Sequence, residues 1–230
     1  MKPSNYRLDD IKNKLYIAGF QPLDVMITGV TGSGKSTTLN ALFNQPVAKI
    51  GEGIDPETMD IQYYQLNVGL RFWDTPGLGD SKERDKIHSK AIVDSLNKCV
   101  RVNGKDHYKF IDLVIVVIEA TKKDLGTVYK LIEQVLLHNI DPKRVLIAVN
   151  QADFAMNGLY WNKKIKEPQL ELVNYLEDFV DKLKLRIEAN MMPLQIPRPI
   201  YYSALYGYNM DKFMDLIIDN IPRHHRNLNE

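Results

Sequence analysis

A glycine-rich stretch near the N-terminus has the residue types needed to bind phosphate. It reads GVTGSGKS at residues 29–36 and matches the pattern G-x-x-x-x-G-K-[S/T] in full. Glycines let backbone N–H groups wrap around a phosphate, the helix that follows adds partial positive charge, and Lys35 adds a full one. Ser36 can ligate magnesium. The spacing of Gly29, Gly34, Lys35 and Ser36 therefore predicts a site for the phosphates of a nucleotide.

A carboxylate and a glycine follow an apolar segment in WDTPG, residues 73–77. Asp74 stands where a carboxylate can reach the magnesium through water. Gly77 follows three residues later and completes D-x-x-G, whose backbone N–H can contact a terminal phosphate and report its loss. The pattern is weak alone, and it gains meaning from following both a phosphate loop and a strand.

The tetrapeptide NQAD, residues 150–153, ends a later apolar segment, at the sheet edge where ligands bind in open α/β sheets. Asp153 can accept hydrogen bonds from both N1–H and the exocyclic amine of guanine, a pair of donors that adenine does not present. A turn that happens to contain Asn and Asp is the alternative for the tetrapeptide alone. Its order behind the other two motifs favours guanine recognition.

The elements that must position these groups alternate between strand and helix. Strands are predicted at residues 25–28, 61–68, 70–75, 111–118, 145–150 and 200–202, and helices near residues 37–44, 87–100, 124–138, 168–189 and 211–221. Gly69 separates the second strand from the third, which predicts an antiparallel hairpin. We therefore expect an α/β fold with a mostly parallel, six-stranded, doubly wound sheet, one antiparallel strand and helices on both faces.

Length, charge and cysteine content limit the possible classes of protein. At 230 residues the chain fits one domain at residues 25–222, with an N-terminal extension containing a short helix at 1–24 and a polar tail at 223–230. Thirty basic and 29 acidic residues give a net charge of +1, which provides no global attraction for nucleic acid or an anionic membrane. One cysteine and no signal peptide predict a cytoplasmic protein. The most apolar run, residues 111–120, is too short to span a bilayer, and the five histidines are interpreted as surface residues.

GVTGSGKS, a switch threonine, WDTPG, NQAD and a final YYSAL occur in an order that resembles the translation-factor-related (TRAFAC) GTPases. Within them the chain resembles the Era-like branch, which includes a group of bacterial GTPases of mobile-element origin. The resemblance covers nearly all of residues 25–221. It implies the G domain of a P-loop NTPase, GTP as substrate, GDP as product and Mg²⁺ as cofactor.

The resemblance also implies roles for individual residues. The phosphates would be bound by Gly29, Thr31, Gly32, Ser33, Gly34, Lys35, Ser36 and Thr37. Magnesium would be held by Ser36, Asp74 and Thr58, the switch threonine in GIDPETMD. Guanine would be bound by Asn150, Gln151, Asp153 and the backbone of Ser203 and Ala204. Catalysis would involve Lys35, Thr58 and Gly77.

Three positions depart from the pattern of the family. Leu78 stands where Ras-like proteins have a glutamine that orients the attacking water, so hydrolysis should be slow unless another group arrives. Some relatives recruit potassium through an asparagine in the phosphate loop, and Gly32 at that position has no side-chain oxygen. Gln151 replaces a lysine, which should reduce affinity but preserve the choice of base.

These residues predict a magnesium-dependent GTPase in which water attacks the γ-phosphate directly. Loops around Thr58 and residues 74–80 would change conformation and control an unidentified protein effector or activator. Self-association across the nucleotide face could supply the missing charge, whereas the nearly neutral chain does not support a ribosomal or RNA target. Two alternatives stay open. One is an ATPase, which Asp153 disfavours, and the other is a nucleotide-dependent interaction module with negligible hydrolysis, which Leu78 allows.

Overall fold

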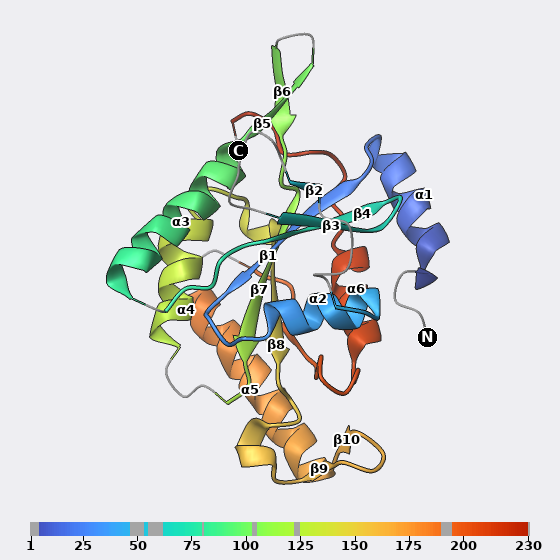
Figure 1. Cartoon of the computed structure of the whole chain (residues 1–230), viewed down its shortest axis with the longest axis vertical. Helices are drawn as coiled ribbons and strands as arrows, with labels where there is room; N and C mark the ends of the chain where they lie inside the picture. Colours follow the sequence, from blue (N-terminus) through green and yellow to red (C-terminus); the bar gives the residue numbers. More distant parts are fainter. Residues whose placement is uncertain are drawn as a thin grey trace.

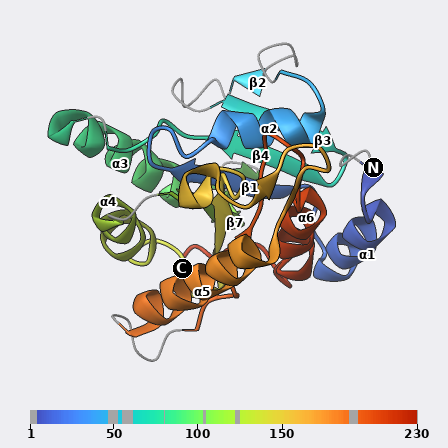
Figure 2. The same cartoon turned by 90° about the horizontal axis from the view of Figure 1, so that it is seen from below.

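The computed structural model describes residues 5–46, 53–54, 62–79, 81–102, 105–121, 125–189 and 195–229. Within these ranges a central sheet is covered by helices on both faces (Figures 1 and 2). The predicted switch threonine, Thr58, and Asp80 lie outside the described residues. None of the helices in the described part of the chain combines the length and apolar character that crossing a bilayer requires.

The central sheet has the order β11-β8-β7-β1-β4-β3-β2. Its strands are β1 (Leu23–Gly29), β2 (Gly53–Ile54), β3 (Gln62–Asn67), β4 (Leu70–Asp74), β7 (Leu113–Glu119), β8 (Val145–Asn150) and β11 (Ile200–Tyr201). Only β3 runs against the others, pairing antiparallel with both β4 and β2. The six predicted strands and the single antiparallel one are confirmed. The two-residue strand β2 adds a seventh at the edge.

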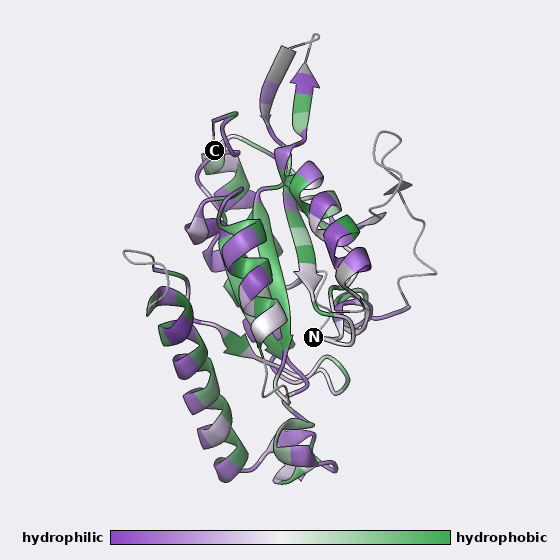
Figure 3. Cartoon of the chain, turned by 90° about the vertical axis from the view of Figure 1, so that its left-hand side faces the viewer, coloured by the Kyte–Doolittle hydropathy of each residue, from purple (hydrophilic) through white to green (hydrophobic). Residues whose placement is uncertain are grey.

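The strands β1, β7 and β8 are rich in apolar residues and lie in the interior of this sheet. All residues of β1 and β8 are buried, as expected for parallel strands covered on both faces. Figure 3 shows these central strands as the most hydrophobic part of the molecule, with hydrophilic residues on the outer faces of the helices. The parallel direction brings the C-terminal ends of the strands to one edge.

Helices divide between the two faces. The helices are α1 (Leu8–Ala18), α2 (Lys35–Phe43), α3 (Lys82–Asn97), α4 (Gly126–Lys130), a π-helix that continues α4 (Leu131–Leu136), two 3₁₀ turns (Pro142–Arg144 and Ala155–Gly158), α5 (Leu170–Ala189) and α6 (Met210–Asp219). Side chains of α1, α2 and α6 pack on one face, and those of α3, the π-helix and α5 pack on the other. This is the doubly wound arrangement that the sequence predicts.

Two short hairpins were not predicted. The first joins β5 (Cys99–Val102) to β6 (Lys105–Lys109), so Val100 belongs to a strand and not to the end of the preceding helix. The helix ends because Lys98 adopts an extended backbone, and the β-branched Val100 and Val102 then favour a strand. The second joins β9 (Trp161–Asn162) to β10 (Glu167–Pro168), so α5 begins after Pro168.

The C-terminal tail packs against the domain. Arg226 is fully buried, and His225 stacks on Tyr108 with its ring 3.8 Å away and contacts Phe20 at 4.1 Å. His225 is therefore not the surface residue that the sequence suggested. Polar composition indicated exposure here because nothing in the tail's own sequence identifies the groups that it meets.

Candidate functional site

The glycine-rich loop connects β1 to α2 at the C-terminal edge of the sheet. Gly29 has φ +147°, and a Cβ built there would lie 2.3 Å from the Val117 carbonyl oxygen. Gly34 has φ +89°, and its added Cβ would lie 2.2 Å from the side-chain nitrogen of Asn150. Side chains are excluded at both positions by space as well as by backbone angle. The loop therefore lies in close contact with Val117 and Asn150 at both glycines.

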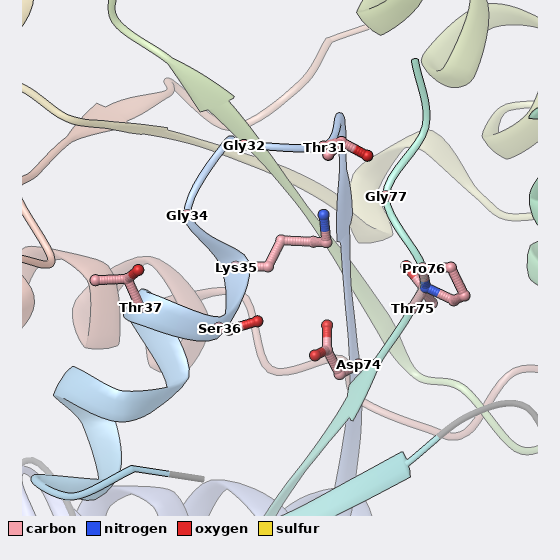
Figure 4. A pocket seen from close by; sticks show the side chains of 10 residues that line it. All are labelled: Thr31, Gly32, Gly34, Lys35, Ser36, Thr37, Asp74, Thr75, Pro76 and Gly77. Carbon is pink, nitrogen blue, oxygen red and sulfur yellow. The ribbon is translucent and has the colours of Figure 1, made fainter. Parts of the chain in front are cut away.

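A cavity of about 590 Å³ opens beside this loop (Figure 4). It is lined by Thr31, Gly32, Gly34, Lys35, Ser36, Thr37, Asp74, Thr75, Pro76 and Gly77. The Lys35 ammonium is buried and donates to the carbonyl oxygens of Gly29 and Val30, each at 3.3 Å. Figure 4 shows Lys35, Ser36 and Asp74 turned toward the same space. The sequence-predicted phosphate residues and Asp74 thus meet at one cavity.

Asp74 ends β4 with a carboxylate that is largely withdrawn from water. Burial raises the pKa of its carboxyl to about 6, against the lowering effect of the nearby Lys35 ammonium. Its Oδ1 is buried and accepts no hydrogen bond from the described residues. A buried acceptor without a donor is costly in isolation. The residues fit a hydrated Mg²⁺ bound mainly through phosphate oxygens, with Ser36 and Asp74 completing its surroundings.

The protein alone does not offer a complete metal cage. Among the residues that the structure describes, no group of three or more His, Cys, Asp or Glu side chains could hold a metal ion. Mg²⁺ commonly takes one or two protein oxygens together with substrate phosphates and water. The chemistry of this donor set therefore suits a metal that arrives with a nucleotide.

Replacing Asp74 by asparagine should stabilise the nucleotide-free protein above pH 6. The folded protein holds a proton on Asp74 up to about pH 6, whereas the unfolded chain loses it near pH 4. The penalty for burying the charge is thus absent below about pH 4 and full above pH 6, where Asp74→Asn should gain about 3 kcal/mol. Urea unfolding of both proteins in EDTA at pH 4, 5.5 and 7.5 measures this difference in the free energy of unfolding. A difference that does not change with pH would contradict the assigned burial of charge.

The segment after Asp74 lies along the phosphate loop. The Thr31 N–H donates to the Leu78 carbonyl at 2.7 Å, and the Leu78 N–H donates to the Gly29 carbonyl at 3.2 Å. A Cβ on Gly77 would lie 2.6 Å from the Thr31 hydroxyl oxygen and 2.8 Å from its Cα. Only glycine fits this approach, so the Gly77 backbone forms the wall of the phosphate cavity.

Leu78 does not line that cavity. Its side chain is 3% exposed and packs in the apolar core beneath α3 and the π-helix. The side chain at this position therefore packs in the core and does not orient water. The sequence predicts that Leu78 cannot form a hydrogen bond to the attacking water, and the structure shows that its side chain is packed in the core instead.

The first half of α3 contacts the same segment. The His88 ring Nδ1 lies 2.7 Å from the Gly77 carbonyl oxygen, and the Gly79 N–H donates to the Asp85 carboxylate at 2.6 Å. Sequence reasoning missed both residues because no motif marks them. The only available signal was their helical spacing directly after D-x-x-G.

A second cavity of about 320 Å³ lies on the other side of the loop. It is lined by Gly32, Gly34, Thr37, Asn150, Gln151, Asp153, Phe154 and Leu205. Asp153 contributes an Oδ1 that is buried and has no hydrogen-bond donor among the described residues. Phe154 and Leu205 are 56% and 70% exposed although they are large and apolar. This cavity combines an acceptor with two apolar walls, which suits a flat, polar-edged ring.

Asn150 and Gln151 brace the loops around this cavity. The Asn150 amide donates to the Ser33 carbonyl and accepts from the Ala204 N–H, both at 3.0 Å. The Gln151 amide donates to the Gly32 carbonyl at 2.8 Å. Gln151 therefore reaches the phosphate loop without the charge of a lysine. Direct contacts of Asn150 and Gln151 with a base remain predictions.

The YYSAL loop completes this side. Ser203 is fully buried, and its N–H donates to the Tyr208 carbonyl at 3.0 Å. The Ala204 N–H donates to Asn150. Both N–H groups thus have partners within the protein, and their contact with a guanine oxygen also stays a prediction.

Comparisons with known proteins agree with this geometry. Residues 24–174 match the family described as 50S ribosome-binding GTPase. GTPase Der of Mesorhizobium japonicum is 22% identical over 204 residues, covering 86% of this chain and 36% of Der. The tRNA modification GTPase MnmE of Mycoplasma mycoides subsp. mycoides is 25% identical over 242 residues, covering 93% of this chain and 53% of MnmE. The chain thus spans about half or less of the length of these relatives.

The fold also resembles a solved structure. Toc33 from Arabidopsis thaliana in complex with GDP and Mg²⁺ matches with a TM-score of 0.61 at 14% identity, covering 97% of this chain and 93% of Toc33. At that identity the similarity supports the fold alone.

Proposed function

Since the chain belongs to the family of 50S ribosome-binding GTPases, we propose that it binds GTP and hydrolyses it to GDP and phosphate with Mg²⁺. We further propose that the state of the nucleotide changes the segment after Asp74 and thereby controls a partner. The family match carries the GTPase assignment. The chemistry assigned to individual residues rests on the two cavities.

The observation that best supports the proposal is a pair of buried carboxylate oxygens for which the described part of the chain provides no donor. Asp74 Oδ1 lies at the phosphate cavity and Asp153 Oδ1 at the second cavity, with the phosphate loop between them. Buried acceptors are normally satisfied in folded proteins. A magnesium-bound guanine nucleotide would satisfy both, because its hydrated metal would meet Asp74 and its N1–H and amine would meet Asp153.

In the proposed reaction the chain positions and neutralises charge. Lys35 and the N-terminal end of α2 would hold the phosphates, and bound Mg²⁺ would neutralise the charge that develops on them. Water would attack the γ-phosphate in line, with no covalent intermediate. The Gly77 N–H would contact the γ-phosphate and release it after cleavage. Since the Leu78 side chain is buried, the group that orients the water would come from a partner or a second copy, and turnover alone would be slow.

Single-turnover phosphate release tests the proposal. We expect slow release from GTP that requires Mg²⁺ and stops in EDTA. A nucleotide-dependent interaction module predicts tight GTP binding with no phosphate release above the rate in buffer. If no phosphate is released, the buried Leu78 side chain, which cannot orient water, supports this second candidate. An ATPase would release phosphate from ATP at least as fast as from GTP.

Finer aspects of the assignment belong to the same proposal. Placement in the Era-like branch, kinship with mobile-element GTPases, a cytoplasmic location and Thr58 as the switch threonine rest on the motifs in the sequence. A ribosomal partner is suggested by the family description and not by the net charge of +1. Self-association across the nucleotide face would bring a second copy close to the exposed Phe154 and Leu205.

Truncating Phe154 should weaken nucleotide binding. We expect the Phe154 ring and Leu205 to enclose the base from two sides, since both line the second cavity and both are exposed without a ligand. Phe154→Ala should raise the Kd for GDP by about tenfold, equivalent to about 1.4 kcal/mol. Titration of a fluorescent GDP measures this change. Leu159→Ala is the control, because Leu159 is similarly exposed at 59% but does not line the cavity. Equal effects of the two substitutions would contradict the enclosure.

A further inference from the structure

The C-terminal segment holds the most deeply buried cation of the described residues. Arg226 is 0% exposed and is the largest of the fully buried side chains. In Figure 1 this segment, coloured red, lies at the same end of the molecule as β5, β6 and the C-terminal end of α3. That end is opposite to the edge that carries the two cavities. A buried guanidinium requires an explanation, because burial of a charge is costly unless it is hydrogen-bonded.

The Arg226 guanidinium contacts backbone carbonyl groups from three parts of the fold. It donates to the Leu96 carbonyl at 2.8 Å, to the Ile111 carbonyl at 3.3 Å, and to the carbonyl of Asn139. Leu96 lies in the last turn of α3, where carbonyl groups lack partners within the helix and the helix dipole favours a positive charge. Arg226 therefore caps α3 and joins it to the start of β7 and to the turn after the π-helix.

The backbone of Arg226 is held by its own carbonyl group and by contacts of the preceding residue. The Lys109 N–H donates to the Arg226 carbonyl at 2.9 Å, which pairs the tail with β6. The preceding His225 has its Nδ1 2.8 Å from the carboxylate of Asp112, and its ring stacks on Tyr108. Asp112 is itself fully buried at the start of β7. The cap is thus attached to β6 and to Asp112, the residue directly before β7.

The other end of α3 is attached to the segment that would meet the γ-phosphate. His88 contacts the Gly77 carbonyl oxygen, and Asp85 accepts from the Gly79 N–H. Burial changes along the helix. Among its described side chains the first fully buried one is Ile92, followed by Ser95 and Leu96, whereas Ile87 is 67% exposed. The front half of α3 is loosely packed and the back half is anchored.

We propose that Arg226 is a positioning residue that holds the C-terminal end of α3, so that a change at Gly77 moves only the front half of the helix. This inference rests on the proposed GTPase function and identifies the residue that holds one end of the helix next to Gly77. A γ-phosphate would then reorder only the front half of α3. Without the cap, the whole helix would have to be ordered when the γ-phosphate binds, and that entropy would weaken binding of the triphosphate.

A purely structural role for Arg226 makes a different prediction. A general loss of stability would weaken the binding of GDP and of a GTP analogue equally, because both nucleotides need the same folded domain. If Arg226 has a positioning role, its substitution weakens the binding of the GTP analogue more than the binding of GDP. The ratio of the two affinities therefore separates the roles.

The test compares Arg226→Met with Arg223→Met in the full chain. Arg223 lies three residues away in the same tail and is exposed. The Kd values for GDP and for a non-hydrolysable GTP analogue are measured by displacement of a fluorescent GDP. Amide hydrogen exchange is followed along α3 without nucleotide and with each nucleotide. Circular dichroism and urea unfolding confirm that each variant is folded.

For Arg226→Met we expect the Kd of GDP to change less than about twofold and that of the GTP analogue to rise about fivefold or more. The difference in exchange between the two nucleotides should extend from residues 82–89 into 92–97. If this variant does not fold, Arg226→Lys replaces it. Lysine keeps the charge with fewer donors and should shift the affinity ratio in the same direction, by about twofold. A folded Met or Lys variant with an unchanged ratio would overturn the proposal.

The same experiment separates this inference from the proposed function. A wild-type protein that binds neither nucleotide would overturn the proposed function and, with it, the positioning role. In that case exchange at residues 92–97 without nucleotide, compared between wild type and Arg226→Met, would still show whether Arg226 anchors α3.

Discussion

Asp153→Asn is expected to weaken binding of GTP and GDP by at least about 100-fold. Each hydrogen bond from the guanine N1–H or amine to an ionised carboxylate contributes about 1.5–3 kcal/mol, and the substitution replaces one acceptor oxygen with a donor. The buried Oδ1 of Asp153 has no donor among the described residues, so no internal contact compensates for the loss. Equilibrium displacement of a fluorescent guanine nucleotide measures the change.

The same variant can be tested for a gain of binding. Xanthine carries a carbonyl oxygen where guanine carries its amine, so it offers an acceptor to the introduced amide. Asp153→Asn should therefore prefer xanthosine diphosphate to GDP, while the wild-type protein should prefer GDP. This reversal also serves as the control for folding. Loss of GDP binding without any gain for the xanthine nucleotide would contradict the assignment of Asp153 to the base.

Lys35→Ala should reduce single-turnover phosphate release by about 100- to 1000-fold. Among the described residues that line the phosphate cavity, Lys35 supplies the cation, and the carbonyl groups of Gly29 and Val30 hold its ammonium group in place. Charge stabilisation of the transferring phosphoryl group would disappear with it, and the affinity for both nucleotides should fall as well.

Lys143→Ala is the matched control for this experiment, because Lys143 is exposed in the 3₁₀ turn before β8 and lies outside the cavity. It should retain the wild-type rate. Identical rates for wild type and Lys35→Ala would contradict the assignment of hydrolysis to this cavity and would favour the interaction module.

The sequence contained most of the information about the sheet and the nucleotide edge. Buried parallel strands produce long apolar runs, so β1, β7 and β8 could be recognised from residue type alone. Their C-terminal ends had to share one edge, and this predicted that Lys35, Asp74 and Asp153 would lie along the same side of the sheet. The structure places all three at the two cavities there.

Features that depend on distant contacts could not be predicted. The buried state of Arg226 depends on carbonyl groups of Leu96, Ile111 and Asn139, which are remote in sequence. The hairpin of β5 and β6 follows directly on α3 with no clear break in composition, so Val100 matched a helical pattern equally well. Phe154 and Leu205 had no polar chemistry to mark them, although each directly follows a predicted base-binding residue in the chain.

Guanine recognition is tested most directly by a competition experiment on the wild-type protein with Mg²⁺. A fluorescent GDP is bound, and GTP, GDP and ATP are titrated against it. We predict that GTP and GDP displace the probe at similar concentrations, whereas ATP requires at least about 100-fold more, because adenine offers no pair of donors to Asp153. Displacement by ATP at the same concentration as GTP would contradict the recognition of guanine by Asp153.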